Sequence, residues 1–166
     1  MKTFFASLFV LISYFSIAQN KDISKKDPLS LKVGISAGSL KSDLLINNQP
    51  INAFVISPKV EIGRAFNFHI GANILTVDSG NLDTVKREIG NLELGLSVQH
   101  QIADLPFYVK GGYLIRITEN YGNRVFAQLG FKLDEQVDFH LIASRLYARK
   151  DIYSGNIVEF GVRLKL

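Results

Sequence analysis

Histidine occurs at only three positions of the 166-residue sequence. One of the three, together with a serine and a glutamate, gives the set of residue types used in nucleophilic catalysis. His140, Ser144 and Glu159 lie on the polar face of two neighbouring predicted strands. A nucleophile and its base must approach within about 3 Å. Antiparallel pairing of these strands would instead separate His140 from Glu159 by about five residues of ~3.4 Å each. We therefore predict no catalytic residue and no enzyme activity.

Motifs for cofactors and metals are absent from the sequence. It contains no P-loop, no Gly-rich dinucleotide fingerprint, no His-rich metal spacing and no EF-hand loop. The lack of Cys excludes a disulfide scaffold, a thiolate metal site and a lipid-modified N-terminal Cys. Asp78, Asp83 and Glu88 could hold a cation loosely, but Lys86 and Arg87 between them favour a solvated loop. We predict no metal and no cofactor.

The N-terminus has the pattern of a secretory signal peptide. Lys2 precedes a stretch without charge from Thr3 to Ala18, which is shorter than the roughly 20 residues of a transmembrane helix. We predict cleavage after Ala18 and export; an uncleaved anchor is the alternative. Residues 19–28 are polar and are predicted to form a flexible leader. The net charge of +4 is small and scattered along the sequence, so nucleic acid is not an expected partner.

From residue 29 to residue 166 the sequence alternates apolar and polar residues, which predicts β-strands with two different environments. One face of these strands carries a single charge, Arg145, whereas the other carries twelve charges and eight of the thirteen glycines. No window of similar length has the period of an amphipathic helix. The eight predicted strands span residues 30–40, 53–63, 67–76, 91–99, 106–117, 124–133, 137–147 and 157–166.

Glycine on the charged face indicates which face lies inside. A water-facing strand surface does not need residues that weaken strands, whereas the lumen of an eight-stranded barrel is only just wide enough for side chains. Long charged residues fit there if glycine makes room. Longer links at residues 41–52, 77–90, 118–123 and 148–156 alternate with shorter ones, as in transmembrane barrels. We predict an all-β fold: a closed, antiparallel, eight-stranded, up-and-down transmembrane β-barrel.

This orientation predicts a charge network that plugs the lumen in two layers. A belt of small residues, including Gly34, Gly95, Gly112 and Gly130, should separate the layers, and Lys132 should face Asp138 across the turn between them. His69 and His140 should point into the lumen as hydrogen-bonding residues. The network is predicted to comprise Lys32, Glu61, Glu93, Lys110, Arg116, Arg124, Lys132, Asp138, Glu159 and Arg163.

The last strand carries the best local signature, with apolar residues at Val158, Phe160, Val162, Leu164 and Leu166. The whole segment from residue 29 onward resembles the small outer-membrane β-barrel proteins of Gram-negative bacteria, above all OmpX-like barrels and the similar domains of Bacteroidota. The resemblance implies an outer-membrane location, contact with outer-membrane lipid, and recognition of these five residues by the insertion machinery. The family usually ends in an aromatic residue, where this chain has Leu166. Any surface partner would contact the longer links, at 41–52, 77–90 and 148–156.

Two other functions fit parts of the sequence. A secreted or periplasmic lipocalin-like carrier would enclose a small apolar ligand; the sequence has no Trp and so lacks the lipocalin Gly-X-Trp signature. An outer-membrane lipid-modifying enzyme would need catalytic groups at the outer end, where no histidine is expected. Support for the carrier comes from apolar residues that interrupt the polar face: Val55, Leu75, Leu114, Phe126, Ile142 and Leu146.

Overall fold

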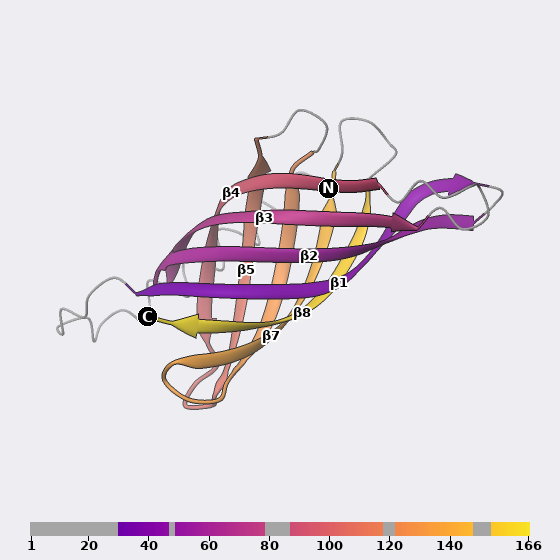
Figure 1. Cartoon of the computed structure of the whole chain (residues 1–166). Helices are drawn as coiled ribbons and strands as arrows, with labels where there is room; N and C mark the ends of the chain where they lie inside the picture. Colours follow the sequence, from indigo (N-terminus) through magenta and orange to yellow (C-terminus); the bar gives the residue numbers. More distant parts are fainter. Residues whose placement is uncertain (1–29, 47–48, 79–86, 118–121, 148–153) are drawn as a thin grey trace, which may run out of the picture.

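The computed structural model describes residues 30–46, 49–78, 87–117, 122–147 and 154–166. Eight antiparallel strands follow one another around a closed barrel, and β1 completes it by pairing with β8 (Figure 1). The predicted fold class is confirmed. The strands are β1 (Leu31–Ile46), β2 (Gln49–Gly63), β3 (Phe66–Asp78), β4 (Arg87–Gln101), β5 (Phe107–Arg116), β6 (Arg124–Lys132), β7 (Val137–Leu146) and β8 (Gly155–Lys165).

Strand register gives the barrel a marked stagger. Register partners traced once around the barrel from Lys32 arrive at Ser42, ten residues farther along β1, and not at Lys32 itself. Such a stagger requires the strands to tilt against the barrel axis. Residues that lie at the same height along the barrel axis are therefore not register partners of one another all the way around the barrel. The partners passed on the way are Glu61, His69, Gly95, Leu114, Arg124, Leu146 and Gly155.

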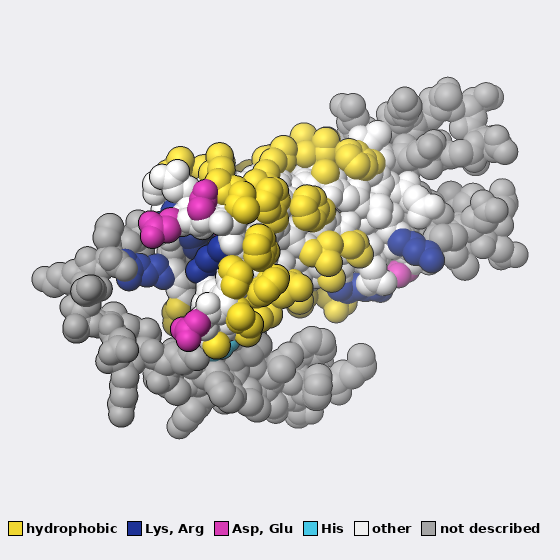
Figure 2. Space-filling view, turned by 90° about the horizontal axis from the view of Figure 1, so that it is seen from below, with side chains coloured by type: hydrophobic (Ala, Val, Ile, Leu, Met, Phe, Trp, Pro, Cys, Tyr) yellow, Lys and Arg dark blue, Asp and Glu magenta, His cyan; other side chains and the backbone are white. Residues whose placement is uncertain are grey.

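Buried and exposed residues alternate along each strand, but the polar residues are buried and the hydrophobic ones are exposed, which is the reverse of a soluble protein. Ile35 is 50% exposed and Phe131 is 37% exposed, whereas Glu61 is fully buried and Arg163 is 1% exposed. Hydrophobic side chains gather over the middle of the outer surface, as Figure 2 shows. The predicted orientation of the two faces is therefore confirmed by the structure.

The β1–β2 hairpin extends farther than the sequence predicts. Pairs such as Lys41↔Asn52 and Ile46↔Gln49 continue the ladder through the predicted 41–52 loop, so that prediction was wrong. The physical reason is a register shift between Lys41 and Leu45, which breaks the period of two while backbone pairing continues. Figure 1 shows the hairpin projecting past the other strands.

Other strand ends also differ from the expected boundaries. β3 reaches Asp78 and β4 begins at Arg87, so the predicted 77–90 loop is shortened from both sides. At the opposite end of the barrel, the described turns are short, and Gly63 ends β2 with a φ of 135°, a conformation that favours glycine. We call this the short-turn end and the other the hairpin end. The predicted signal peptide and leader, residues 1–28, lie outside the described residues.

No helix among the described residues is long and apolar enough to span a membrane.

Candidate functional site

A group of five charged residues fills the lumen near the short-turn end, and we call it the Glu61 cluster: Lys59, Glu61, Lys110, Asp138 and Arg163. The fully buried Glu61 carboxylate contacts three cations. Lys110 Nζ donates to Glu61 Oε2 at 2.6 Å, Lys59 Nζ lies 3.6 Å from Oε1, and Arg163 donates to Oε2. Arg163 also binds Asp138 Oδ2 through Nε at 2.8 Å and Nη2 at 2.7 Å. One guanidinium thus joins both carboxylates of the cluster.

Tyr108 extends this cluster through the hydroxyl group of its buried side chain. Its hydroxyl donates to Asp138 Oδ1 at 2.7 Å and accepts from Gln128 Nε2 at 2.8 Å. The ring stacks within 5.0 Å of the Arg163 guanidinium carbon, and a Cβ at Gly130 would collide with it. Sequence reasoning missed Tyr108, although its inward position between Phe107 and Val109 was a usable signal. Glycine here makes room for a large neighbour, as the composition of the polar face indicated.

Four residues closer to the hairpin end form a second group, the Glu159 cluster: Glu93, Arg116, Arg124 and Glu159. Arg124 binds Glu159 and lies 3.8 Å from Glu93 Oε2, and Arg116 Nη2 lies 3.0 Å from Glu93 Oε1. Neutral side chains provide further hydrogen bonds to the Glu159 carboxylate. Ser36 Oγ donates to Glu159 Oε1 at 3.1 Å, and the Ser57 hydroxyl contacts the same oxygen. This cluster has no net charge, because two guanidinium groups meet two carboxylates.

Apolar side chains close the rest of the lumen. Leu114, Phe126 and Ile142 form one buried cluster, and they use the room left by glycine: Leu114 lies over Gly95, and Phe126 lies over Gly112. The expected belt of small residues is therefore wrong in part, since glycine admits apolar neighbours there. A second cluster closes the hairpin end, with Leu40, Ala53, Val55, Leu75, Leu146 and Ile157.

Nine of the ten predicted network residues are buried inside the barrel, and Lys132 is the exception. Its side chain is exposed at the end of β6, although Lys132 and Asp138 are register partners as expected. On the neighbouring strand β8, Arg163 is also a register partner of Asp138, and its guanidinium binds the Asp138 carboxylate. Two nitrogens of the planar guanidinium contact the same carboxylate oxygen, Asp138 Oδ2, and the guanidinium offers more donors in a fixed geometry than an ammonium does. The ion pair expected for Lys132 is therefore replaced by that of Arg163.

Arg145, the one charge that the sequence predicts on the outward face, has a partner that the sequence did not reveal. Its Nη1 donates to Asp43 Oδ1 at 2.8 Å and to Asn156 Oδ1 at 3.3 Å, and Nη2 contacts Asp43 Oδ2. The two charged groups come from β7 and β1 and meet across β8 at the hairpin end. The side chain of Arg145 is 36% exposed, and its charge is balanced by the Asp43 carboxylate.

The register of β7 and β8 pairs His140 with Gly161 and Ile142 with Glu159, so the predicted separation of five residues between His140 and Glu159 was wrong and is two. Of the rejected catalytic triad, His140 nevertheless contacts a different cluster from Ser144 and Glu159. His140 Nδ1 lies 3.6 Å from Asp138 Oδ1, in the Glu61 cluster, whereas Ser144 Oγ accepts a hydrogen bond of 2.9 Å from Arg124 Nε. Glu159 is bound by Arg124. The side chains of the acidic 78–88 segment lie outside the described residues; within the described part of the chain, no three His, Asp or Glu residues are placed to hold a metal ion.

Little free space remains between the two charge clusters. The cavity there, lined among others by Ser57, His69 and Arg124, has a volume of about 30 Å³, which suits one or two water molecules. The apolar residues that suggested a lipocalin-like carrier pack against one another in the two apolar clusters. They therefore do not enclose a space of the size that a small apolar ligand needs.

The fold is similar to that of solved transmembrane barrels. The crystal structure of Neisserial surface protein A (NspA) matches with a TM-score of 0.62 and 12% identity, over 84% of this chain and 100% of that chain. A structure from the de novo design of transmembrane β-barrels matches with a TM-score of 0.55 and 13% identity, over 86% of this chain and 99% of that chain. The sequence matches no protein-family model and no curated protein.

Proposed function

We propose that this chain is a non-enzymatic, integral outer-membrane protein of a Gram-negative bacterium, exported by a cleaved signal peptide. The observation that supports this most strongly is the reversed polarity of the closed barrel. Charged groups such as Glu61, Arg163 and Glu159 are at most 1% exposed, while 27 large hydrophobic residues of the described ranges lie exposed. Only a hydrocarbon environment makes such an outer surface favourable. The similarity to NspA supports the same assignment at the level of fold.

Aromatic residues support a position for the membrane interface. Phe66, Phe68, Phe107, Phe131 and Phe139 all lie exposed close to the short-turn end, where a girdle of interfacial rings would lie. Short turns face the periplasm in outer-membrane barrels. The short-turn end is therefore assigned to the periplasm and the β1–β2 hairpin to the cell surface.

The last strand suits recognition by the insertion machinery. On β8, Val158, Phe160 and Leu164 are exposed on the outward face, as is Leu166 just beyond the strand. Val162 shares this face and is half-buried. An alternating apolar strand of this kind is the segment that the family resemblance implies for insertion. Replacement of Phe160 and Leu164 by Ser should therefore slow insertion more than the same change at Val33 and Ile35 on β1.

The two charge clusters and the apolar cluster at the hairpin end act as a plug. Buried ion pairs hold the strands at fixed positions, and apolar packing closes the lumen between them and the cell surface. Contacts with other molecules then fall to the parts that project from this rigid barrel. Among the described residues the projecting part is the β1–β2 hairpin. The links predicted at 77–90 and 148–156 are proposed as further contact segments, so the function assigned is surface contact or support of the envelope.

Membrane fractionation tests this function directly. After expression in a Gram-negative host, the protein should appear in the outer-membrane fraction, and unheated samples should migrate differently from heated ones on a denaturing gel. A variant with residues 2–18 deleted should stay in the cytoplasm and give a single heat-independent band. Recovery of the wild-type protein in the soluble periplasmic fraction would contradict the proposal and favour the carrier.

A further inference from the structure

Positive charge is concentrated on the inner wall of the barrel at the short-turn end. Six cations of the described strands lie on the inward face in this half of the barrel, four of them buried or half-buried and two, Lys132 and Lys165, exposed at its rim. The carboxylates on the same face of these strands are Glu61 and Asp138. The Glu159 cluster nearer the hairpin end is neutral by comparison. The small net charge that looks scattered in the sequence is thus gathered in one place. The six cations are Lys32, Lys59, Lys110, Lys132, Arg163 and Lys165.

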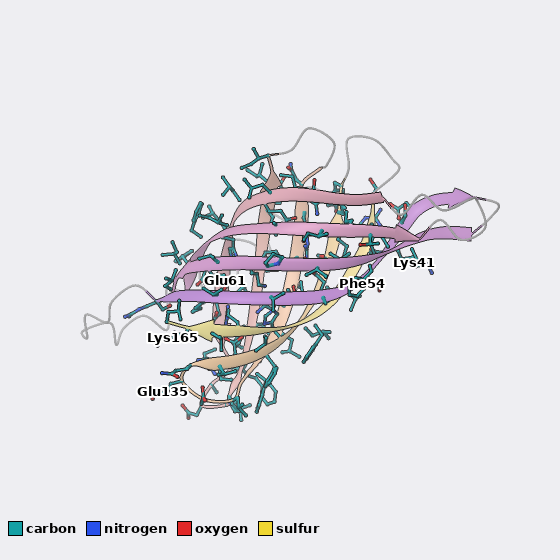
Figure 3. All side chains as sticks on the ribbon, in the orientation of Figure 1. Lys41, Phe54, Glu61, Glu135 and Lys165 are labelled. Atoms are coloured by element: carbon teal, nitrogen blue, oxygen red, sulfur yellow. The ribbon has the colours of Figure 1, made fainter. Side chains whose placement is uncertain are left out.

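An open vestibule gives access to part of this charge. It has a volume of about 1160 Å³ and is lined by Lys32, Lys132 and Lys165 around Arg163 and Asp138, among others. Figure 2 shows Lys and Arg side chains gathered in the opening at the left end of the barrel, and Figure 3 shows Lys165 at this same end. A concave site with walls of low dielectric focuses the field of its charges.

Three of these lysines form no direct ion pair with a carboxylate of the described residues. Lys32 and Lys165 are direct register partners on β1 and β8, and like charges placed directly opposite each other are destabilising. The Lys32 ammonium donates to Asn67 Oδ1 at 3.3 Å, a neutral acceptor. Within the described ranges, Lys132 and Lys165 form no ion pair. Repulsion between the ammonium groups of Lys32 and Lys165 destabilises the folded barrel. An anion bound between them would remove this repulsion and stabilise it.

Carboxylates nearby do not remove this excess. Asp138 is bound by Arg163 and Tyr108. Asp134 accepts hydrogen bonds from the backbone N–H groups of Gln136 and Val137 in its own turn. Asp104, Asp134 and Glu135 line the vestibule from its outer turns, as does Arg64, and they are as exposed as Lys132 and Lys165. Counted with these turn residues, the described side chains at this end carry seven cations and five carboxylates, an excess of two positive charges.

We propose that this vestibule is a binding site for the phosphate group of a phosphate ester, held by Lys32, Lys165 and Lys132. Lysine is a common phosphate ligand that acts as a point charge. A group with two negative charges would offset the excess of two positive charges that the described side chains leave at this end. The vestibule is larger than a phosphate alone, so the phosphate would belong to a larger molecule, which is either a free solute or a lipid headgroup. This site does not depend on the proposed cellular location, because it is a property of the folded barrel.

Calorimetric titration with inorganic pyrophosphate tests the site. The full chain is folded in micelles of an uncharged detergent at low ionic strength, and folding of each variant is checked by its heat-dependent gel migration. The wild type should bind pyrophosphate saturably at one site, and K32Q/K165Q should bind at least tenfold more weakly. The matched variant K41Q removes a lysine at the opposite end of the barrel (Figure 3) and should bind as the wild type does. Absence of saturable binding, or equal affinity in K32Q/K165Q, would overturn the proposal.

Competition then identifies the source of the phosphate. Displacement of pyrophosphate by glycerol 3-phosphate alone supports a free phosphorylated solute, and displacement by dihexanoyl phosphatidic acid supports a lipid headgroup. If neither phosphate ester displaces pyrophosphate, the proposal that the site takes phosphate esters is wrong. The variant K132Q separates the contributions within the site and should weaken pyrophosphate binding by a smaller factor than K32Q/K165Q.

Discussion

Lys110 Nζ donates to Glu61 Oε2 across 2.6 Å, although the two residues lie 49 positions apart on strands that are not neighbours in the barrel. The contact spans the lumen from β5 to β2. Neither group reaches water, since both side chains are fully buried. Ion pairs inside the barrel therefore join strands on opposite sides of the lumen as well as adjacent strands of the sheet.

The first prediction concerns the carboxylate at the centre of this brace. Glu61→Gln should lower the free energy of unfolding by about 3–5 kcal/mol, because it leaves Lys59, Lys110 and Arg163 without their shared counter-charge. Urea unfolding in phosphatidylcholine vesicles measures the change. Glu135→Gln, at an exposed turn residue, should stay within about 0.5 kcal/mol of wild type. Equal effects of the two substitutions would show that the Glu61 cluster does not stabilise the barrel.

A second prediction tests why glycine lies on the inner face. Gly130→Val should destabilise the barrel by about 1–3 kcal/mol, because the added side chain collides with the Tyr108 ring. Gly111→Val is the matched control, since a Cβ there meets only Phe126 O, at 3.8 Å. The control should be neutral or stabilising, because glycine weakens a strand interior. The same unfolding measurement decides, and a tolerated Gly130→Val would contradict the crowding argument.

Exposed and buried ion pairs should differ in their contribution to stability. Asp43→Asn should cost less than about 1 kcal/mol, since the Asp43–Arg145 pair is 36–45% exposed. Glu159→Gln should cost several times more, because it leaves Arg124 buried beside a single remaining carboxylate, Glu93. Comparison of the two unfolding midpoints in one lipid provides the test. A larger loss for Asp43→Asn would mean that the outer pair is the more important brace.

The plug leads to a prediction about conductance. In a planar lipid bilayer the wild-type barrel should show no steady, large single-channel current, because two charge clusters and an apolar cluster close the lumen in series. Disruption of one cluster by Glu61→Gln should leave the other two closed, so this variant should not conduct either. A steady large current through the wild type would show that the plug is open.

Alternation along the sequence was sufficient to predict all eight strands and the inward and outward faces, and nine of the ten charged residues predicted inside the barrel are buried there. It could not predict which charges meet. The ten-residue stagger brings Glu61, Lys110 and Arg163 to one height, and stagger is a property of the closed sheet that no single strand encodes. The extended β1–β2 hairpin was missed for another reason, since a register shift after Lys41 hides the period of two.

The central claim, that apolar side chains face hydrocarbon around an ionic lumen, is best tested by spin labels placed one at a time along β7. The chain contains no Cys, so each substitution provides a unique attachment point. In lipid vesicles, collision with oxygen should vary with a period of two residues, with maxima at Phe139, Leu141 and Ala143 and minima at His140 and Ile142. Oxygen maxima at His140 and Ile142, or strong collision of the first three labels with a water-soluble nickel reagent, would contradict the account.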